Sequence, residues 1–215
     1  YVYVADFGNH RVRRIDKITG AVTTIAGSGS SGTDDGTGTS AKFRNPMDVT
    51  SLGNYLYVTD RNNHRIRRID KSTKTVTTIA GSSSGFTNAT GTSAKFYYPW
   101  GIVNDGENLY IGDGHNQRIR KVVIATGAVT TFAGSGSSGN TDAIATSARF
   151  SYPYSVAIDY KNLYVADYSN HRIRNIPLRG TETADVAMHN LDDDADVTVS
   201  LTSSDTGEAT VSPAS

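Results

Sequence analysis

Short runs in which apolar and polar residues alternate recur along the chain, and Gly, Asn and Ser separate one run from the next. Residues 46–81 show the pattern: PMDVTS, YLYVTD, RIRRID and TVTTIAG are separated by LGN, RNNH and KSTK. Alternation with a period of two, carried by β-branched and aromatic residues, is typical of strands joined by tight turns. The pattern predicts a four-stranded antiparallel meander in this unit.

The unit is written four times. Its copies align without a gap as VYVADFGNHRVRRID (2–16), LYVTDRNNHRIRRID (56–70), LYIGDGHNQRIRKVV (109–123) and LYVADYSNHRIRNIP (163–177). The shared aspartates Asp6, Asp60, Asp113 and Asp167 lie 54, 53 and 54 residues apart. A four-stranded unit that recurs about every 50 residues predicts the blades of a β-propeller. The chain is therefore expected to be all-β, with a partial propeller of about three and a half four-stranded blades.

Longer polar segments, such as GSGSSGTDDGTGTSAKFRN (27–45), connect the meanders. Each ends in TSAKF or TSARF, which predicts one helical turn capped by Ser or Thr. The closing phenylalanines Phe43, Phe96 and Phe150 are expected to point inward, between adjacent meanders. Asp34, Asp35 and Asp142 match no calcium-loop spacing and are expected to be solvated.

The repeated blocks resemble NHL repeats. The resemblance rests on [LV]-Y-[VI]-x-D-x-x-N-[HQ]-R-[IV]-R, preceded by F-x-x-P and followed by V-T-T-[IF]-A-G, and it covers residues 1–177. It is similar to the long-linker variety of bacterial surface proteins and teneurin-type proteins. This resemblance implies a complete propeller of six blades, less often five or seven. We therefore expect further blades upstream, or self-association through exposed blade faces.

The charge distribution predicts a boundary near residues 177–180. Residues 1–179 carry 21 Lys and Arg against 13 Asp and Glu, whereas residues 180–215 carry 8 acidic residues and no Lys or Arg. Such a change of sign marks a domain boundary or a tail. We expect a propeller at 1–179, and an acidic linker with the beginning of a β-sandwich-like module at 180–215. Within the second segment, TADVAM (183–188) offers a weak last strand for the fourth blade, and ADVTVSLTSS (195–204) alternates like a strand of the new module.

The motif between the second and third strands of each blade carries the most regular polar residues. Its members are Asp6, Asn9, His10, Arg11, Asp60, Asn63, His64, Arg65, Asp113, Asn116, Arg118, Asp167, Asn170, His171 and Arg172. A ring of histidines suggests zinc, but the hairpins lie midway along the blades, and the third copy has Gln117 in place of His. The recurrence favours a structural role. We expect Asp60 to pair with Arg65, and Asn63 to take the left-handed turn position.

Basic residues in the third strands suggest nucleic acid, and some NHL propellers bind RNA through a basic face. Here the Arg and Lys residues alternate along strands that pack between blades. Their aliphatic portions are expected to be buried there, while their charged groups reach carboxylates. Nucleic-acid binding is therefore not expected, although it remains a lesser alternative.

Positions beside the repeated proline differ between blades and begin the innermost strand, at the mouth of the central channel. The candidate ligand-binding residues are Arg44, Met47, Tyr97, Tyr98, Trp100, Tyr152 and Tyr154. Aromatic rings with polar groups give large contact areas in sugar or peptide recognition, whereas the alternative is that they fill space under the linkers. We expect Trp100 to be partly exposed.

Two functional classes remain after these observations. The favoured one is a non-enzymatic scaffold for a protein, peptide or glycan ligand, without a cofactor or metal, in a larger extracellular or cell-surface protein. The alternative is a metal-dependent lyase or lactonase-type propeller, with part of its site in further blades. The predicted inner strands carry Asp48 without a His or Glu, and no general base has a partner that can be named. No apolar run is long enough to insert into a membrane.

Overall fold

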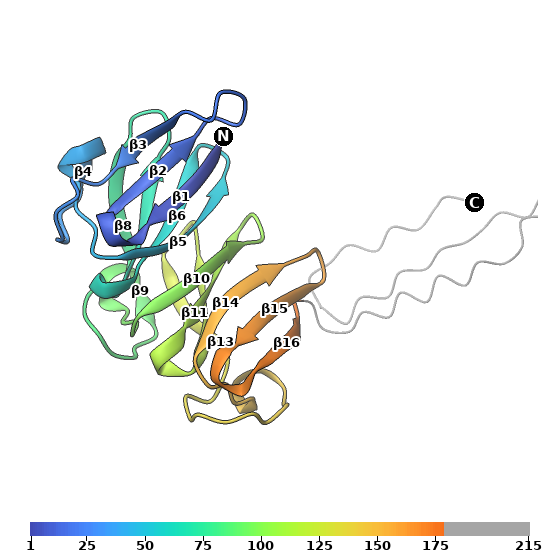
Figure 1. The fold of residues 1–215 in the computed structure, drawn as a ribbon. Helices are drawn as coiled ribbons and strands as arrows, with labels where there is room; N and C mark the ends of the chain where they lie inside the picture. Colours follow the sequence, from blue (N-terminus) through green and yellow to red (C-terminus); the bar gives the residue numbers. More distant parts are fainter. Residues whose placement is uncertain (179–215) are drawn as a thin grey trace, which may run out of the picture.

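The computed structural model describes residues 1–178, which form four small antiparallel sheets that follow one another in chain order (Figure 1). The first sheet holds β1 (Val2–Asp6), β2 (Arg11–Ile15) and β3 (Val22–Ala26), and the second β5 (Pro46–Leu52), β6 (Tyr55–Asp60), β7 (Arg65–Asp70) and β8 (Thr75–Ala80). The third holds β10 (Pro99–Asn104), β11 (Asn108–Asp113), β12 (Arg118–Val123) and β13 (Ala128–Ala133), and the last β14 (Pro153–Ile158), β15 (Asn162–Asp167) and β16 (Arg172–Pro177). The predicted all-β propeller is confirmed.

The sheets are arranged as blades, with their first strands toward the centre. β10 contacts both β5 and β14, so the first strands of three successive blades lie beside one another. β1, which is equivalent by sequence to the second strand of the other blades, contacts β5. Since Pro46, Pro99 and Pro153 begin the inner strands and pair with Asp60, Asp113 and Asp167, the proline and the hairpin motif share one end of each blade.

The core lies between the blades. One apolar cluster joins blades 1 and 2 around Phe43, the next joins blades 2 and 3 around Phe96, and the third joins blades 3 and 4 around Phe150. Each of these rings is at most 1% exposed. The predicted inward position of the three phenylalanines is confirmed.

The linkers depart from the prediction in two respects. Each does form one helical turn, a 3-10 turn, at Gly38–Ser40, Gly91–Ser93 and Ala145–Ser147, but no side chain caps it. Instead, the backbone N–H of Ala94 donates to the carbonyl oxygen of Gly91, which closes the turn without a hydroxyl. In addition, β4 (Gly36–Thr37) and β9 (Ala89–Thr90) pair with the outer strands β8 and β13, so these two sheets gain a short fifth strand.

The expected second module at 180–215, with the run TADVAM, lies outside the described residues. Helical structure within residues 1–178 is limited to single 3-10 turns, and none of it could span a membrane.

Candidate ligand-binding surface

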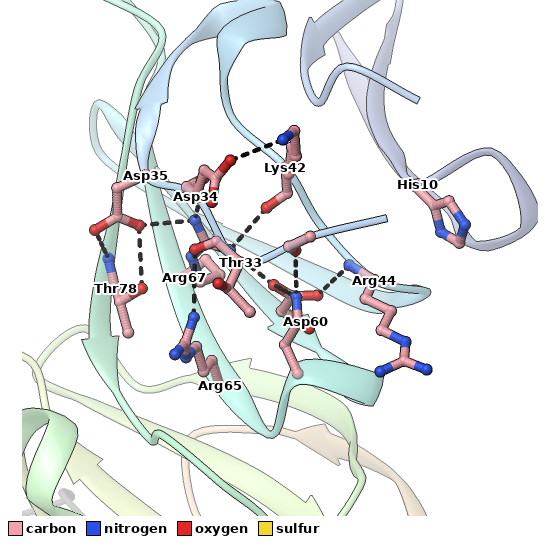
Figure 2. A network of polar contacts seen from close by, with 12 residues as sticks. His10, Thr33, Asp34, Asp35, Lys42, Arg44, Asp60, Arg65, Arg67 and Thr78 are labelled. Carbon is pink, nitrogen blue, oxygen red and sulfur yellow. Dashed lines mark hydrogen bonds and ion pairs between the residues drawn. The ribbon is translucent and has the colours of Figure 1, made fainter. Parts of the chain in front are cut away.

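The repeated hairpin motif builds a buried ion pair, but between different residues from those expected. Arg67 Nη1 lies 2.7 Å from Asp60 Oδ2, and both side chains are fully buried (Figure 2). Arg65 instead donates to the carbonyl oxygen of Thr33 in the linker. The predicted Asp60–Arg65 pair is therefore wrong: Arg65 is the direct cross-strand partner of Asp60, yet the long side chain of Arg67 reaches the carboxylate diagonally.

Every described blade repeats this arrangement. The pairs are Asp6–Arg13, Asp113–Arg120 and Asp167–Arg174, at 3.2, 2.9 and 2.9 Å. In the first blade the two side chains remain 23% and 28% exposed, whereas Asp113 and Arg120 are completely buried. The first arginine of each motif (Arg11, Arg65, Arg118, Arg172) donates to linker carbonyl oxygens. The motif therefore fastens the linker to the blade.

Linker aspartates take part in the same network. Asp35 accepts a hydrogen bond from buried Arg67 at 2.7 Å and also from the hydroxyl of Thr78 (Figure 2). Asp142 pairs with Arg174, and Asp34 with Lys42. The side chains of Asp34, Asp35 and Asp142 are 58%, 48% and 84% exposed, so they remain solvated as expected, and each also pairs with a cation.

The histidine of the motif ties one blade to the next. His64, with φ of 57°, holds the left-handed position expected for Asn63, and His10, Gln117 and His171 are equivalent. The asparagine instead donates to the aspartate, as Asn63 does to Asp60 at 2.8 Å. His64 Nδ1 accepts from the backbone N–H of Tyr98 in the following blade, and Gln117 Oε1 accepts from that of Tyr152. Both His and Gln supply the required acceptor, which explains the substitution.

Aromatic side chains of blades 2 to 4 meet at this same end of the molecule. We call their group the aromatic surface; it consists of His64, Tyr97, Tyr98, Trp100, His115, Tyr152, Tyr154 and Tyr168, with Arg61 among them. Neighbouring ring centroids lie between 3.7 and 5.9 Å apart. Tyr97 is 37% exposed and Tyr168 61%. The rings therefore form one continuous contact area that crosses three blades.

A stack of planar groups runs through this surface. The Trp100 and Tyr154 rings are 3.7 Å apart and nearly parallel, and the Arg61 guanidinium lies 4.4 Å from the Trp100 ring centre. Two planar groups so close to one ring must cover opposite faces of it. Tyr168 stacks on Tyr154 at 4.7 Å. Gly114 permits the stack, because a Cβ there would meet Trp100 at 3.1 Å and Tyr154 at 3.3 Å.

Five of the seven predicted ligand-binding residues, namely Tyr97, Tyr98, Trp100, Tyr152 and Tyr154, are brought together in this way. Trp100 is half-buried, as predicted. Met47 and Arg44 occupy the equivalent positions of blade 2, outside the ring–ring contacts. Sequence reasoning missed Arg61, His115 and Tyr168. The sequence did hold an indication of these residues, because the two positions after each motif aspartate vary between the copies. They are Phe-Gly, Arg-Asn, Gly-His and Tyr-Ser in blades 1 to 4.

The surface is electropositive. Within residues 1–178, neither Arg44 nor Arg61 forms an ion pair, whereas the motif aspartates are already neutralised by arginines. Burial, followed by the charges of Arg44 and Arg61, lowers the pKa of His64. Burial and the charge of Arg61 likewise lower the pKa of His115. Both histidines are therefore neutral near pH 7, and the positive charge of the surface comes from the arginines.

Asp48 is the carboxylate of the inner strands, and it joins blades 2 and 3. Its Oδ2 accepts from the backbone N–H of Ile102 at 2.9 Å and its Oδ1 from that of Val49 at 2.8 Å. Burial raises the pKa of Asp48. Among residues 1–178, no three His, Asp or Glu side chains lie close enough together to hold a metal ion.

Comparison with known proteins agrees with this architecture. Human NHL repeat-containing protein 2 is 33% identical over 142 residues, which cover 60% of this chain and 20% of the human protein. An auxiliary nutrient binding protein from Bacteroides ovatus superposes with a TM-score of 0.64 at 26% identity, covering 82% of this chain and 45% of that one. A protein of unknown function from Bacteroides thetaiotaomicron gives a TM-score of 0.66 at 26% identity, covering 80% of this chain and 43% of that one.

No protein-family model matches the chain. The sequence and structural similarities nevertheless agree with the repeated blocks and the four blades: the chain forms propeller blades whose repeats are similar to those of NHL repeat-containing proteins. It spans a fifth of the human relative and less than half of the two solved structures.

Proposed function

We propose that the chain is a non-enzymatic scaffold whose aromatic surface, at the mouth of the propeller, holds a protein, peptide or glycan ligand. The observation that carries this proposal is the position of the rings. They lie where the blades differ, whereas the residues that recur in every blade are occupied in holding the blades together. Residues beyond those needed for the repeat are available for recognition. The nutrient-binding neighbour from Bacteroides ovatus supports a binding role.

The geometry of the stack indicates how a ligand would make contact. Both faces of the Trp100 ring are covered, by Arg61 and Tyr154. A flat ligand group therefore meets the more exposed rings of Tyr97 and Tyr168, and the hydroxyl edges of the other tyrosines. Tyrosine presents a large rigid contact area together with a polar group, which suits peptide and sugar recognition.

The single tryptophan of the chain provides the assay. Labelled protein is first applied to a glycan array and a peptide array, and the best-bound probe is then titrated while Trp100 emission is recorded. We expect the emission to change on binding, and Tyr168→Ala to weaken binding about 10-fold or more, as for a contact worth roughly 1.4 kcal/mol or more.

Tyr160→Ala is the matched control, because Tyr160 is 81% exposed in the loop between β14 and β15, at the opposite end of the strands. Equal affinities for the two variants, or binding without a change in Trp100 emission, would show that the ligand sits elsewhere.

We also propose that the chain is part of a larger secreted or cell-surface protein of the long-linker kind. Further blades upstream, or a second copy, would cover the apolar residues of the first blade, where Val2 is 44% and Val4 39% exposed. An antibody against the propeller tests the location: it should label intact cells of the source organism, and labelling only after permeabilisation would contradict the proposal.

A further inference from the structure

Arg61 lies within the aromatic surface, and its guanidinium is held from several sides. The guanidinium carbon lies 4.4 Å from the centre of the Trp100 ring and 4.6 Å from that of the Tyr98 ring. Arg61 Nη1 donates to Asn62 Oδ1 at 2.8 Å, and Asn62 Nδ2 donates to Asn45 Oδ1 at 2.9 Å. Because these contacts already fix the guanidinium, it loses little conformational freedom when it binds a ligand.

This guanidinium has no carboxylate partner within residues 1–178. Asp60, which precedes it in the sequence, is bound instead to Arg67. Arg61 Nη2 is not buried and makes no hydrogen bond with the described residues, whereas Arg61 Nε and Trp100 Nε1 are buried without a protein acceptor. Donors therefore exceed acceptors around this cation, and its Nη2 is the group left for an acceptor from outside the propeller.

Arg44 adds a second positive charge beside Arg61. Its carbonyl oxygen accepts from the backbone N–H of Asn62 at 3.0 Å, while its exposed side chain points away from the ion-pair network of the blade (Figure 2). Burial is the main cause that lowers the pKa of His64, and the charges of Arg44 and Arg61 follow it, so both arginines act on one imidazole. The two arginines are confined to blade 2: the equivalents of Arg44 are Tyr97 and Ser151, and those of Arg61 are Phe7, Gly114 and Tyr168.

We propose that the aromatic surface binds the carboxylate of an acidic sugar, a uronic acid within a glycan, with Arg61 as the anchor and Arg44 beside it. This inference rests on the proposed function and names the class of its ligand. A carboxylate that accepts from Arg61 Nη2 forms a charge-assisted hydrogen bond, which is stronger than a bond between neutral groups. The neighbouring rings exclude water from one side of this bond, and Arg44 adds attraction from the rim.

The remaining groups of the surface fit a sugar better than a peptide. The hydroxyls of Tyr110 and Tyr164 bond to aspartates, whereas the tyrosine hydroxyls of the aromatic surface have no partner within residues 1–178. These hydroxyls match those of a sugar, and the electron-rich ring faces match its C–H groups. An acidic peptide also supplies a carboxylate, but its backbone amides need partners such as a free strand edge. The aromatic surface consists of residues in turns and at the beginning of strands.

Probes that differ only in charge test the proposal. Short oligomers of galacturonic acid and of glucuronic acid, and the methyl ester of each, are titrated against the full chain while Trp100 emission is recorded. We expect at least one acid to bind about 10-fold or more tightly than its ester, as for a hydrogen bond to a charged group. Arg61→Gln should abolish this preference, and Arg61→Lys, which keeps the charge but not the planar group, should retain part of it.

Lys161→Gln is the matched control, because it removes one positive charge from the exposed turn between β14 and β15, at the opposite end of the strands. Its affinity for the acid should equal that of the parent, and a loss as large as that of Arg61→Gln would show that net charge alone attracts the ligand. Arg44→Gln removes a side chain that makes no hydrogen bond or ion pair with the described residues. It should weaken binding of the acid about 2- to 5-fold at an unchanged Tm, even if Arg61→Gln disturbs the stack.

Three results would overturn the proposal: equal affinities for acid and ester, no binding of either acid, or an oligoglutamate peptide that binds more tightly than both acids. The array probe separates these results from a failure of the proposed function. If Tyr168→Ala weakens binding of that probe while the acids are not preferred, the surface binds a ligand of another class. If no probe is sensitive to Tyr168→Ala, the proposed function fails as well.

Discussion

Replacing Asp113 by Asn tests the role of the repeated ion pair. The Asp113 carboxylate is fully buried and accepts three hydrogen bonds, from Arg120 Nη1, Asn116 Nδ2 and the backbone N–H of Tyr97, at 2.9, 2.8 and 2.8 Å. Asparagine keeps the shape but removes the charge, and it turns an NH₂ group toward one of these donors. Arg120, also fully buried, is left without its carboxylate partner.

The expected cost follows from burial. Removing one partner of a buried pair costs about 3–5 kcal/mol, because the remaining charge is desolvated and uncompensated. Asp6→Asn is the matched variant: it removes the same partner from the same motif, but from a pair with side chains 23% and 28% exposed. Such a pair contributes roughly 0–1 kcal/mol, since water already solvates both groups.

Urea unfolding followed by circular dichroism measures both free energies. With an m value of about 2–3 kcal/mol/M, Asp113→Asn should lower the midpoint by about 1–2 M, and Asp6→Asn by less than about 0.5 M. Adding Arg120→Met to Asp113→Asn should recover part of the loss, because it removes the unpaired charge. Equal losses for Asp113→Asn and Asp6→Asn would refute the argument that burial sets the cost.

Two further predictions concern the backbone and pH. Gly81→Ala should destabilise the protein by about 2 kcal/mol more than Gly106→Ala in the same unfolding assay. Both glycines have positive φ, but at Gly81 an added Cβ would collide with the backbone oxygen of His64, whereas at Gly106 it would meet nothing within 4 Å. A similar loss at both positions would show that φ alone matters. Because the folded protein lowers the pKa of His64, the unfolded chain binds the proton first and stability falls as the pH drops below about 6.5. His64→Gln, which copies the acceptor of Gln117, should therefore lose less stability than the parent between pH 7.5 and 5.5, and an unchanged pH dependence would contradict this.

The strands were predictable from the sequence because equivalent residues have the same structural role, burial between blades, in each copy. Val12, Ile66 and Ile119 occupy the same position in successive copies, within strands of alternating apolar and polar residues, and all three are buried, so pattern and structure agree. The partner of Asp60 was not predictable in this way. Arg65 and Arg67 lie on the same side of one strand, and only the depth of the packing between linker and blade decides which reaches the carboxylate.

The sequence indicated which aromatic residues beside the proline lie together, but it did not indicate that residues of the hairpin join them. Tyr97 and Tyr154 stood out because aromatic residues replaced Arg and Met at equivalent positions. Arg61 falls in the predicted turn RNNH, and the sequence of one blade gives no indication that its hairpin packs against the first strand of the next. That contact between blades, seen in the stacking of Arg61 on Trp100, appears only in three dimensions.

The central claim is that residues that vary between blades bind the ligand, whereas residues repeated in every blade hold the blades together. Backbone amide shifts in two-dimensional NMR spectra, recorded with and without the probe selected from the arrays, test this claim most directly. The largest changes should fall at residues 97–100, 114–116, 152–154 and 168–170, which carry the aromatic surface. Changes concentrated in the turns at the opposite end, 53–54, 105–107 and 159–161, with the aromatic surface unaffected, would contradict the account.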